Sequence, residues 1–177
     1  MLDNFKEEVV VNHNTLIPNL LYVFAWIALI FFGFFALISL QLLVAAFNMT
    51  TLLVTALSAG AAVGLFLFKD RLKVEYEYTF TNGTLDFARV FHNTSRKELG
   101  SMNVKNVAAC GHVAHDSFNR YLSMQGLEKK NWFLNRDGNL FYFYYEKNDG
   151  KHMIIIEPSE EMVGMIRGYL PFGVYQG

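Results

Sequence analysis

The most constraining feature of this sequence is a long stretch without formal charge: no Asp, Glu, Lys or Arg occurs between Glu8 and Lys69. Over the whole chain the charges nearly balance, with 15 Lys+Arg against 16 Asp+Glu. This balance excludes a generally basic nucleic-acid-binding protein, which would carry an excess of Lys and Arg. The chain therefore divides into an uncharged N-terminal part and a C-terminal part of ordinary charge.

The uncharged part contains two apolar runs that are long enough to cross a membrane. A bilayer core of ~30 Å needs about 20 apolar residues in a helix. Residues 20–47 exceed this length with Gln41 as the only strongly polar side chain, and residues 51–68 come close to the minimum. We predict a transmembrane helical hairpin over residues 20–68, with spans at about 20–43 and 51–68.

Two further interpretations of the apolar runs are less consistent with their length. A cleaved signal peptide has an apolar region of roughly 7–15 residues after a basic start. Here the first run is longer, and the start of the chain, MLDNFKEEVV, is more acidic than basic. A helical hairpin buried in a globular core would leave too little chain to cover it. Membrane helices are therefore the favoured interpretation.

Basic residues at the ends of the spans predict the orientation, because Lys and Arg resist translocation. Lys6 precedes the first span, and Lys69, Arg71 and Lys73 directly follow the second, whereas the connecting turn has no basic residue. We expect a multi-pass plasma-membrane protein with both termini in the cytoplasm, including the N-terminal segment 1–19. Lys69, Arg71 and Lys73 are expected to lie at the membrane interface.

Three small residues of the second span, Ala56, Gly60 and Gly64, repeat every four positions and therefore share one helix face. Small residues at this spacing let another helix approach closely. The short connecting turn favours packing of this face against the first span. The face could instead form a homodimer, or attach the chain as an accessory subunit to a larger membrane complex.

After the second span the apolar period changes to two, which is typical of a half-buried β-strand. Val74, Tyr76, Tyr78 and Phe80 alternate with polar residues. The following dipeptide Asn82-Gly83 is a strong hairpin signal, because a type I′ turn needs positive φ at both central residues. We therefore predict an antiparallel hairpin directly after the membrane part.

The remaining pattern predicts more strands and one C-terminal helix. Residues 97–113 contain one or two strands, and residues 112–131 have weak periodicity and are predicted to be mostly loop. Residues 131–147 are expected to form two strands around an Asp137-Gly138 turn, followed by a hairpin turn at 147–151. Pro158 and the acidic residues after it begin an amphipathic helix at 159–170.

Several strands closed by one C-terminal amphipathic helix resemble a pleckstrin-homology-like (PH-like) domain. The segments RLKVEYEYTFTNGTLDF, RKELGSMNVKNVAACG, NWFLNRDGNLFYFYYEK and IIIEPSEEMVGMIRGYLPFGVYQG resemble an uncharacterised bacterial family of small two-span membrane proteins. This resemblance implies an α+β membrane protein, in which a transmembrane hairpin precedes a cytoplasmic PH-like antiparallel β-barrel or sandwich at residues 69–177. It implies no activity and no catalytic residues.

The densest cluster of reactive side chains is the segment CGHVAHDS, which contains Cys110, His112, His115, Asp116 and Ser117. A structural zinc site needs four ligands, and Cys-x-His-x-x-His is not a known ligand spacing. Nucleophilic catalysis would need Cys110 or Ser117 beside an oriented histidine, but no nucleophile-elbow motif is present. We expect a strand end followed by a polar loop. The single cysteine excludes an internal disulfide and fits a reducing compartment.

Aromatic residues of the C-terminal part have two interpretations. Trp132, Phe141, Phe143 and Tyr145 either fill the domain core or form an exposed partner surface, since large exposed apolar patches usually mark interaction sites. In the first case neighbouring elements cover both faces of the strand at 141–146. Trp132, with Lys129 and Lys130, is also a candidate for contact with the membrane surface.

No cofactor is expected, because the sequence lacks a glycine-rich phosphate loop, an acidic metal pair and a dinucleotide fingerprint. Phosphoinositide binding is disfavoured, because the loop between the first two strands, Asn82-Gly83, is uncharged. We therefore expect a non-enzymatic module, anchored in the lipid bilayer, that binds a membrane or cytoplasmic protein. The competing functions are a membrane-bound enzyme using residues 110–117 and an accessory subunit of a larger complex.

Overall fold

The structure is a computed structural model that describes residues 4–177. The chain forms two compact units. The helical unit consists of residues 14–74 together with the short turn 91–94, and the β unit consists of residues 4–13, 75–90 and 95–177. The chain thus leaves the β unit after its first strand and returns to it after the helices.

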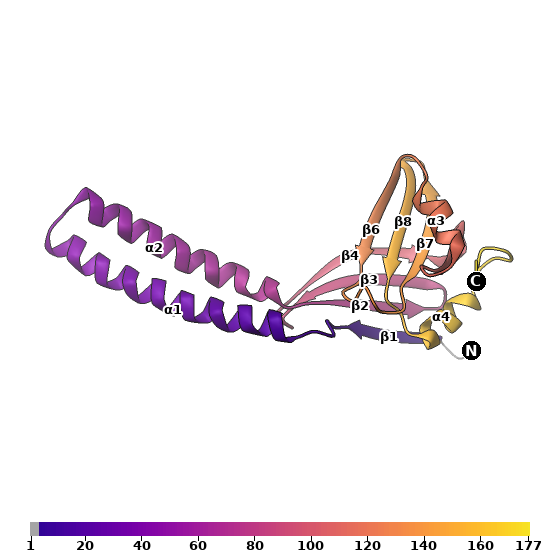
Figure 1. Cartoon of the computed structure of the whole chain (residues 1–177), viewed down its shortest axis with the longest axis horizontal. Helices are drawn as coiled ribbons and strands as arrows, with labels where there is room; N and C mark the ends of the chain where they lie inside the picture. The colour runs from indigo at the N-terminus through magenta and orange to yellow at the C-terminus, as the bar shows by residue number, and fades with distance from the viewer. Residues whose placement is uncertain (1–3) are drawn as a thin grey trace. The chain divides into compact units, whose positions relative to one another are not determined.

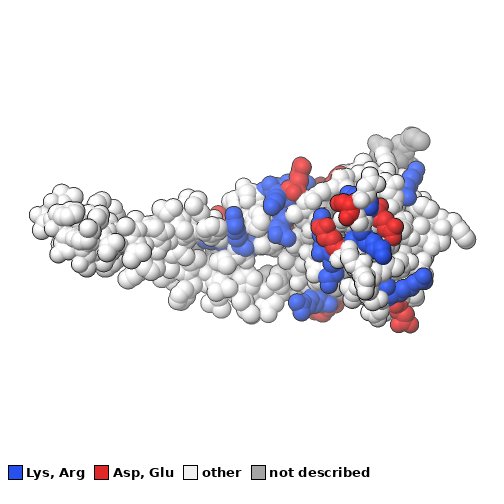
Figure 2. All heavy atoms as spheres, turned by 90° about the horizontal axis from the view of Figure 1, so that it is seen from above, with Lys and Arg blue, Asp and Glu red and all other residues white. Residues whose placement is uncertain are grey.

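The helical unit contains two long apolar helices, α1 (Leu16–Ala45) and α2 (Met49–Phe68), followed by a 3₁₀ turn η1 (Lys69–Leu72). Both helices are long and apolar enough to cross a membrane. In the most apolar window of each helix only 6% of the residues are buried. A hairpin in the core of a globular protein would be mostly buried, so the buried-hairpin interpretation is wrong. The spheres of this part are almost uniformly white in Figure 2, which colours charged residues blue and red.

The two helices pack through small residues, of which Ala25 and Ser39 of α1 and Ser58 of α2 are buried. Each serine hydroxyl bonds to a carbonyl of its own helix: Ser39 Oγ to Ala36 at 3.0 Å and Ser58 Oγ to Val54 at 2.8 Å. These serine hydroxyls therefore satisfy their hydrogen bonds within their own helices.

The first sheet has the strand order β1-β2-β3-β4. Its strands are β1 (Phe5–Val10), β2 (Val74–Thr81), β3 (Thr84–Phe91) and β4 (Ser95–Asn103). Strand β1 pairs antiparallel with β2, from Phe5 opposite Thr81 to Val10 opposite Tyr76. The sequence pattern predicts residues 1–19 as a segment separate from the domain, whereas residues 4–13 belong to the β unit. Two features explain why the sequence pattern does not reveal this pairing. Strand β1 contains charged residues, and its partner strand lies far away in the sequence.

The predicted hairpin between β2 and β3 is confirmed. Asn82 has φ 47° and Gly83 has φ 91°, as a type I′ turn requires. A Cβ atom on Gly83 would also lie 2.8 Å from Cδ1 of Tyr169. Both backbone conformation and space therefore demand glycine at this position.

The second sheet has the order β5-β7-β8-β6. It consists of β5 (Ala109–His112), β7 (Phe141–Lys147), β8 (Gly150–Ile156) and β6 (Leu127–Trp132) (Figure 1). The predicted hairpin β7–β8 is confirmed by antiparallel pairing from Phe141 opposite Ile156 to Lys147 opposite Gly150. The strands form two separate sheets, and not one closed barrel.

Two sequence-based predictions for this sheet are wrong. Residues 112–131, predicted to be mostly loop, contain the helix α3 (Asp116–Leu122) and most of β6. Residues 131–147 do not form a hairpin, because β6 pairs in parallel with β8 and residues 133–140 connect it to β7. Parallel pairing depends on contacts that are distant in sequence, so a turn dipeptide such as Asp137-Gly138 does not reveal it.

The C-terminal helix α4 (Glu160–Arg167) lies within the predicted range. The Ser159 side chain caps it by accepting a hydrogen bond from the Met162 N–H at 3.2 Å. Met162, Val163 and Ile166 form its buried face. The core of the β unit is rich in aromatic residues, and the fully buried large side chains include Tyr78, Phe80, Phe141 and Phe143.

Candidate membrane-interface site

All the formal charges of the helical unit lie in η1 and the residue that follows it. Lys69 is buried, and its Nζ lies 3.0 Å from Oδ2 of Asp70. The same ammonium lies 5.2 Å from the ring centre of Trp26 and 4.9 Å from that of Phe66. An ion pair and two aromatic faces thus replace the water that a lysine ammonium normally binds.

The next two cations also lie over aromatic rings. The Arg71 guanidinium carbon lies 4.6 Å from the ring centre of Phe68, and Lys73 Nζ lies 4.6 Å from that of Tyr22. The Tyr22 ring has a second neighbour, the His92 imidazole, at 4.7 Å between ring centres. We name this set of side chains the collar; it consists of Tyr22, Trp26, Phe66, Phe68, Lys69, Arg71, Lys73 and His92.

The short turn between β3 and β4 brings His92 into the collar. His92 and Asn93 both have positive φ, 47° and 54°, although neither is glycine. The His92 N–H donates to the Lys73 carbonyl at 2.8 Å, and the Thr94 N–H closes the turn on the Phe91 carbonyl at 2.9 Å. Non-glycine residues in this conformation carry strain that surrounding contacts must offset. The turn is therefore held by the helical unit.

The collar combines the two features typical of a membrane–water interface. Tyr and Trp prefer the headgroup region, and Lys and Arg at a span end extend their charged groups toward it. The three predicted interface residues, Lys69, Arg71 and Lys73, are brought together. Sequence reasoning missed Tyr22 and Trp26, which the four-residue spacing near the start of the first span could have indicated.

The predicted packing of the small-residue face against α1 is wrong. A Cβ atom added to Gly60 or Gly64 would meet no atom of the described chain within 4 Å, and Ala56 is exposed. The face of α2 that meets α1 instead centres on Ser58. A homodimer or a larger complex built on Ala56, Gly60 and Gly64 stays a prediction.

The exposed-surface interpretation of the aromatic residues is wrong. Phe141 and Phe143 are fully buried, and Tyr145 and Trp132 are each 8% exposed. The Trp132 ring lies 4.8 Å from the Phe87 ring, and Tyr78 donates its hydroxyl proton to the Trp132 carbonyl. These contacts join the two sheets.

Strand β7 is covered on both faces, as the core interpretation of its aromatic residues predicts. Its second face carries Tyr142 and Tyr144, which pack with Phe118 of α3 and with Met153 and Ile155 of β8.

The reactive side chains of the segment from Cys110 to Ser117 make contacts within the fold of the β unit. Cys110 is fully buried in β5, and burial raises the pKa of its thiol to about 12. Its backbone binds the C-terminal segment, since its N–H donates to the Val174 carbonyl at 3.0 Å. Ser117 Oγ does lie 2.8 Å from His115 Nδ1, but His115 is the N-cap residue of α3 and also accepts from the Ser117 N–H. The imidazole nitrogen that contacts the Ser117 hydroxyl thus also caps α3, and the same hydroxyl lies 3.0 Å from Tyr142 Oη.

The other histidine of this segment, His112, has different partners. His112 Nδ1 lies 2.9 Å from Asn139 Oδ1, and its ring packs edge-on against Phe141. Within residues 4–177 no group of three or more His, Cys, Asp or Glu side chains is arranged to hold a metal ion. An enzyme function that uses residues 110–117 stays a prediction.

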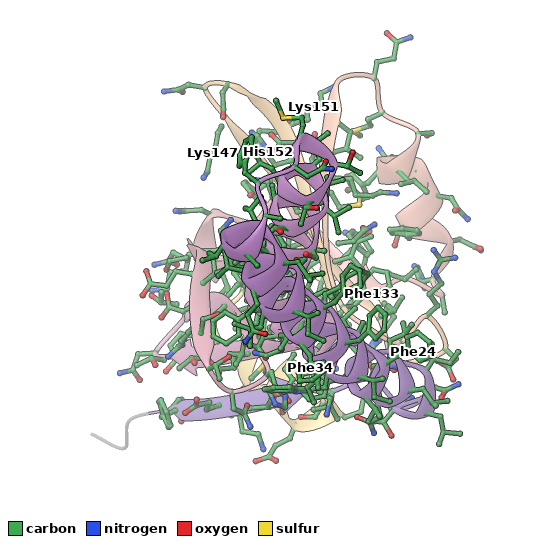
Figure 3. All side chains as sticks on the ribbon, turned by 90° about the vertical axis from the view of Figure 1, so that its left-hand side faces the viewer. Phe24, Phe34, Phe133, Lys147, Lys151 and His152 are labelled. Atoms are coloured by element: carbon green, nitrogen blue, oxygen red, sulfur yellow. The ribbon has the colours of Figure 1, made fainter. Side chains whose placement is uncertain are left out.

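A cluster that the sequence did not suggest lies near the β7–β8 turn, where Figure 3 labels His152 and Lys147. The buried His152 ring lies between two carboxylates: Nδ1 is 3.2 Å from Glu128 of β6, and Nε2 is 3.0 Å from Asp149. The hydrogen bond with His152 lowers the pKa of the Asp149 carboxyl. Because the carboxylates meet opposite ring nitrogens, the cluster ties β6 to the hairpin and does not converge on one ion.

The outer face of the first sheet carries an open groove of about 540 Å³. Acidic side chains predominate among its charged lining residues, with Glu7, Asp86 and Glu98 beside Arg96. The groove thus gathers several charged groups on one face of the β unit.

Comparison with known protein families agrees with this architecture. The family model described as bacterial PH-like domain (DUF6106) matches residues 3–176. The chain belongs to this family. The DUF6106 assignment establishes the PH-like domain, and the two apolar helices fit the predicted N-terminal two-span hairpin. Searches of the curated proteins and of the solved structures found no significant match.

Proposed function

We propose that this PH-like protein is a non-enzymatic interaction module anchored in the bacterial plasma membrane by α1 and α2. Both termini lie in the cytoplasm, and the collar lies at the cytoplasmic headgroups. The β unit presents a binding surface to a membrane or cytoplasmic protein.

The observation that carries this proposal is the absence of a free linker after α2. Helix α2 ends at Phe68, η1 ends at Leu72, and Lys73 alone separates η1 from β2. One residue spans at most about 3.6 Å, so the start of β2 stays within a short distance of the headgroups. A domain tethered this closely is suited to act on other components of the membrane surface.

The burial of Cys110 and the capping role of His115 support the non-enzymatic part of the proposal, because they leave the competing enzyme function without an activated nucleophile. A binding role needs an accessible surface, and the groove on the first sheet supplies one.

Affinity purification of the full chain in mild detergent, followed by mass spectrometry, tests the binding role. We expect a stoichiometric protein partner that is lost when Asp86 in the groove is replaced by lysine. The matched control is Asp137→Lys, which makes the same charge change at an exposed turn outside the groove. Retention of the partner by D86K would exclude the groove, and no partner from any of the three chains would contradict the interaction module.

A further inference from the structure

We propose that the collar binds the phosphate of anionic phospholipids, with Arg71 and Lys73 as its charged ligands and His92 as a neighbouring polar group. This inference rests on the proposed membrane function, and it names the lipid class that the anchor selects. The site is distinct from the β2–β3 turn of the PH-like domain, which is uncharged.

The first observation behind the inference is the charge that remains after internal pairing. Asp70 is the only acidic residue of the helical unit, and it pairs with Lys69 at 3.0 Å. In residues 4–177 no carboxylate lies within 4.0 Å of Arg71 or Lys73 in an ion pair. Two cations of the collar therefore keep their charge available for an external anion.

The second observation is that aromatic rings hold these cations in place. Arg71 lies over Phe68 and Lys73 over Tyr22, each at 4.6 Å. A ring face attracts a cation without neutralising it, so it positions the charge and reduces the entropy lost on binding. Arg71 adds a planar fork of donors that matches phosphate oxygens.

The third observation is the strained turn that places His92 beside Lys73. The imidazole packs on the Tyr22 ring that also supports the Lys73 ammonium. Its backbone N–H fixes the position through the Lys73 carbonyl at 2.8 Å. Strain of this kind is concentrated at binding sites, where contacts elsewhere offset it. Lys73, Tyr22 and His92 thus form one cluster at the end of the helices.

The location of the charge favours a lipid over a soluble anion. The cations directly follow a helix long enough to cross the bilayer, whereas the opposite turn, between α1 and α2, has no charged residue. Basic residues at this depth attract anionic headgroups, by about fivefold for each cation near the surface. Two cations should therefore enrich anionic lipid around the collar, and the neutral turn should not.

Fluorescence of Trp26 gives a direct readout, because this ring is part of the collar. The chain has two tryptophans, and the buried Trp132 is removed by Trp132→Phe. The full chain is reconstituted into vesicles of equimolar phosphatidylcholine and phosphatidylglycerol, in which one lipid at a time is brominated near the headgroup end of an acyl chain. Bromine quenches a tryptophan that it contacts, so the ratio of the two quenching efficiencies reports the lipid composition around the collar.

We expect brominated phosphatidylglycerol to quench several-fold more than brominated phosphatidylcholine. The double variant Arg71→Gln/Lys73→Gln should bring the ratio close to one. The charge-matched control Lys97→Gln/Lys105→Gln changes exposed lysines of the β unit and should keep the original ratio. Continued quenching by phosphatidylcholine shows that a variant is still inserted.

Four outcomes would contradict the proposals, and each can be distinguished from the others. Equal quenching by both lipids in the starting chain would overturn the lipid inference and leave membrane insertion intact. A preference that survives R71Q/K73Q would overturn the assignment of Arg71 and Lys73 as the charged ligands. No quenching by either lipid would instead contradict the proposed membrane function itself. Inorganic phosphate that replaces chloride at constant ionic strength should leave the ratio unchanged, whereas abolition of the preference would indicate a site for free phosphate.

Discussion

Replacement of Phe143 by alanine is expected to lower the free energy of unfolding of the β unit by about 3–5 kcal/mol. Phe143 is fully buried in β7, and its ring packs against Phe141 with 5.1 Å between ring centres. A phenylalanine-to-alanine change in a core removes the transfer free energy of the ring and leaves a cavity. Since tenfold in an equilibrium constant is about 1.4 kcal/mol, the most protected amides of β7 and β8 should exchange about a hundredfold faster or more.

Hydrogen exchange by mass spectrometry on the full chain in detergent measures this effect. The control is Phe172→Ala, because Phe172 is fully exposed and its truncation should change stability by no more than about 0.5 kcal/mol. Equal effects of the two substitutions would mean that β7 is not the centre of the core.

Two arginines in the middle of α1 are expected to prevent this helix from inserting. Ile30 and Phe34 are 64% and 66% exposed and lie near the middle of the helix. Arginine at the centre of a span costs about 3 kcal/mol, so Ile30→Arg/Phe34→Arg should make insertion about 6 kcal/mol less favourable. The control places two arginines at the same spacing near the start of the helix, Leu16→Arg/Leu20→Arg. This change should raise the insertion free energy far less, because arginine there reaches the headgroups.

The measurement for these variants is the apparent insertion free energy of residues 16–45 in a translocon assay. A similar cost at the centre and at the start of the helix would argue that α1 does not span the bilayer along its length.

The sequence predicted the elements whose signal is local. The two long apolar helices depend on composition, and the β2–β3 turn depends on the dipeptide Asn82-Gly83, so both are predictable without knowledge of distant partners. Strands β1 and β6 were missed for the opposite reason. Phe5–Val10 pairs with residues about 70 positions away, and the parallel pairing of Leu127–Trp132 with β8 follows no hairpin rule.

The collar was predictable in part for a similar reason. Lys69, Arg71 and Lys73 stand out because they interrupt an apolar pattern, whereas Tyr22 and Trp26 blend into it. His92 could not be assigned from sequence, since a turn between two strands brings it beside Lys73.

The first strand of the β unit precedes the two helices in the sequence, and this affects how the domain can be studied. A fragment that begins at Leu72 would lack β1, which forms the edge of the first sheet and pairs with β2 over its whole length. Glu8 of this strand also binds the Ser159 N–H at 2.9 Å, next to the start of α4. Experiments on binding should therefore use the full chain.

Cysteine labelling of intact bacterial cells tests the central claim, a two-span anchor with both termini in the cytoplasm, most directly. The native Cys110 is buried, so single cysteines introduced at Phe47, in the turn between the helices, and at Phe172 report separately on the two sides. With a membrane-impermeant maleimide, Phe47→Cys should be labelled in intact cells and Phe172→Cys only after lysis. Labelling of Phe172→Cys in intact cells, or of neither position before lysis, would contradict this topology.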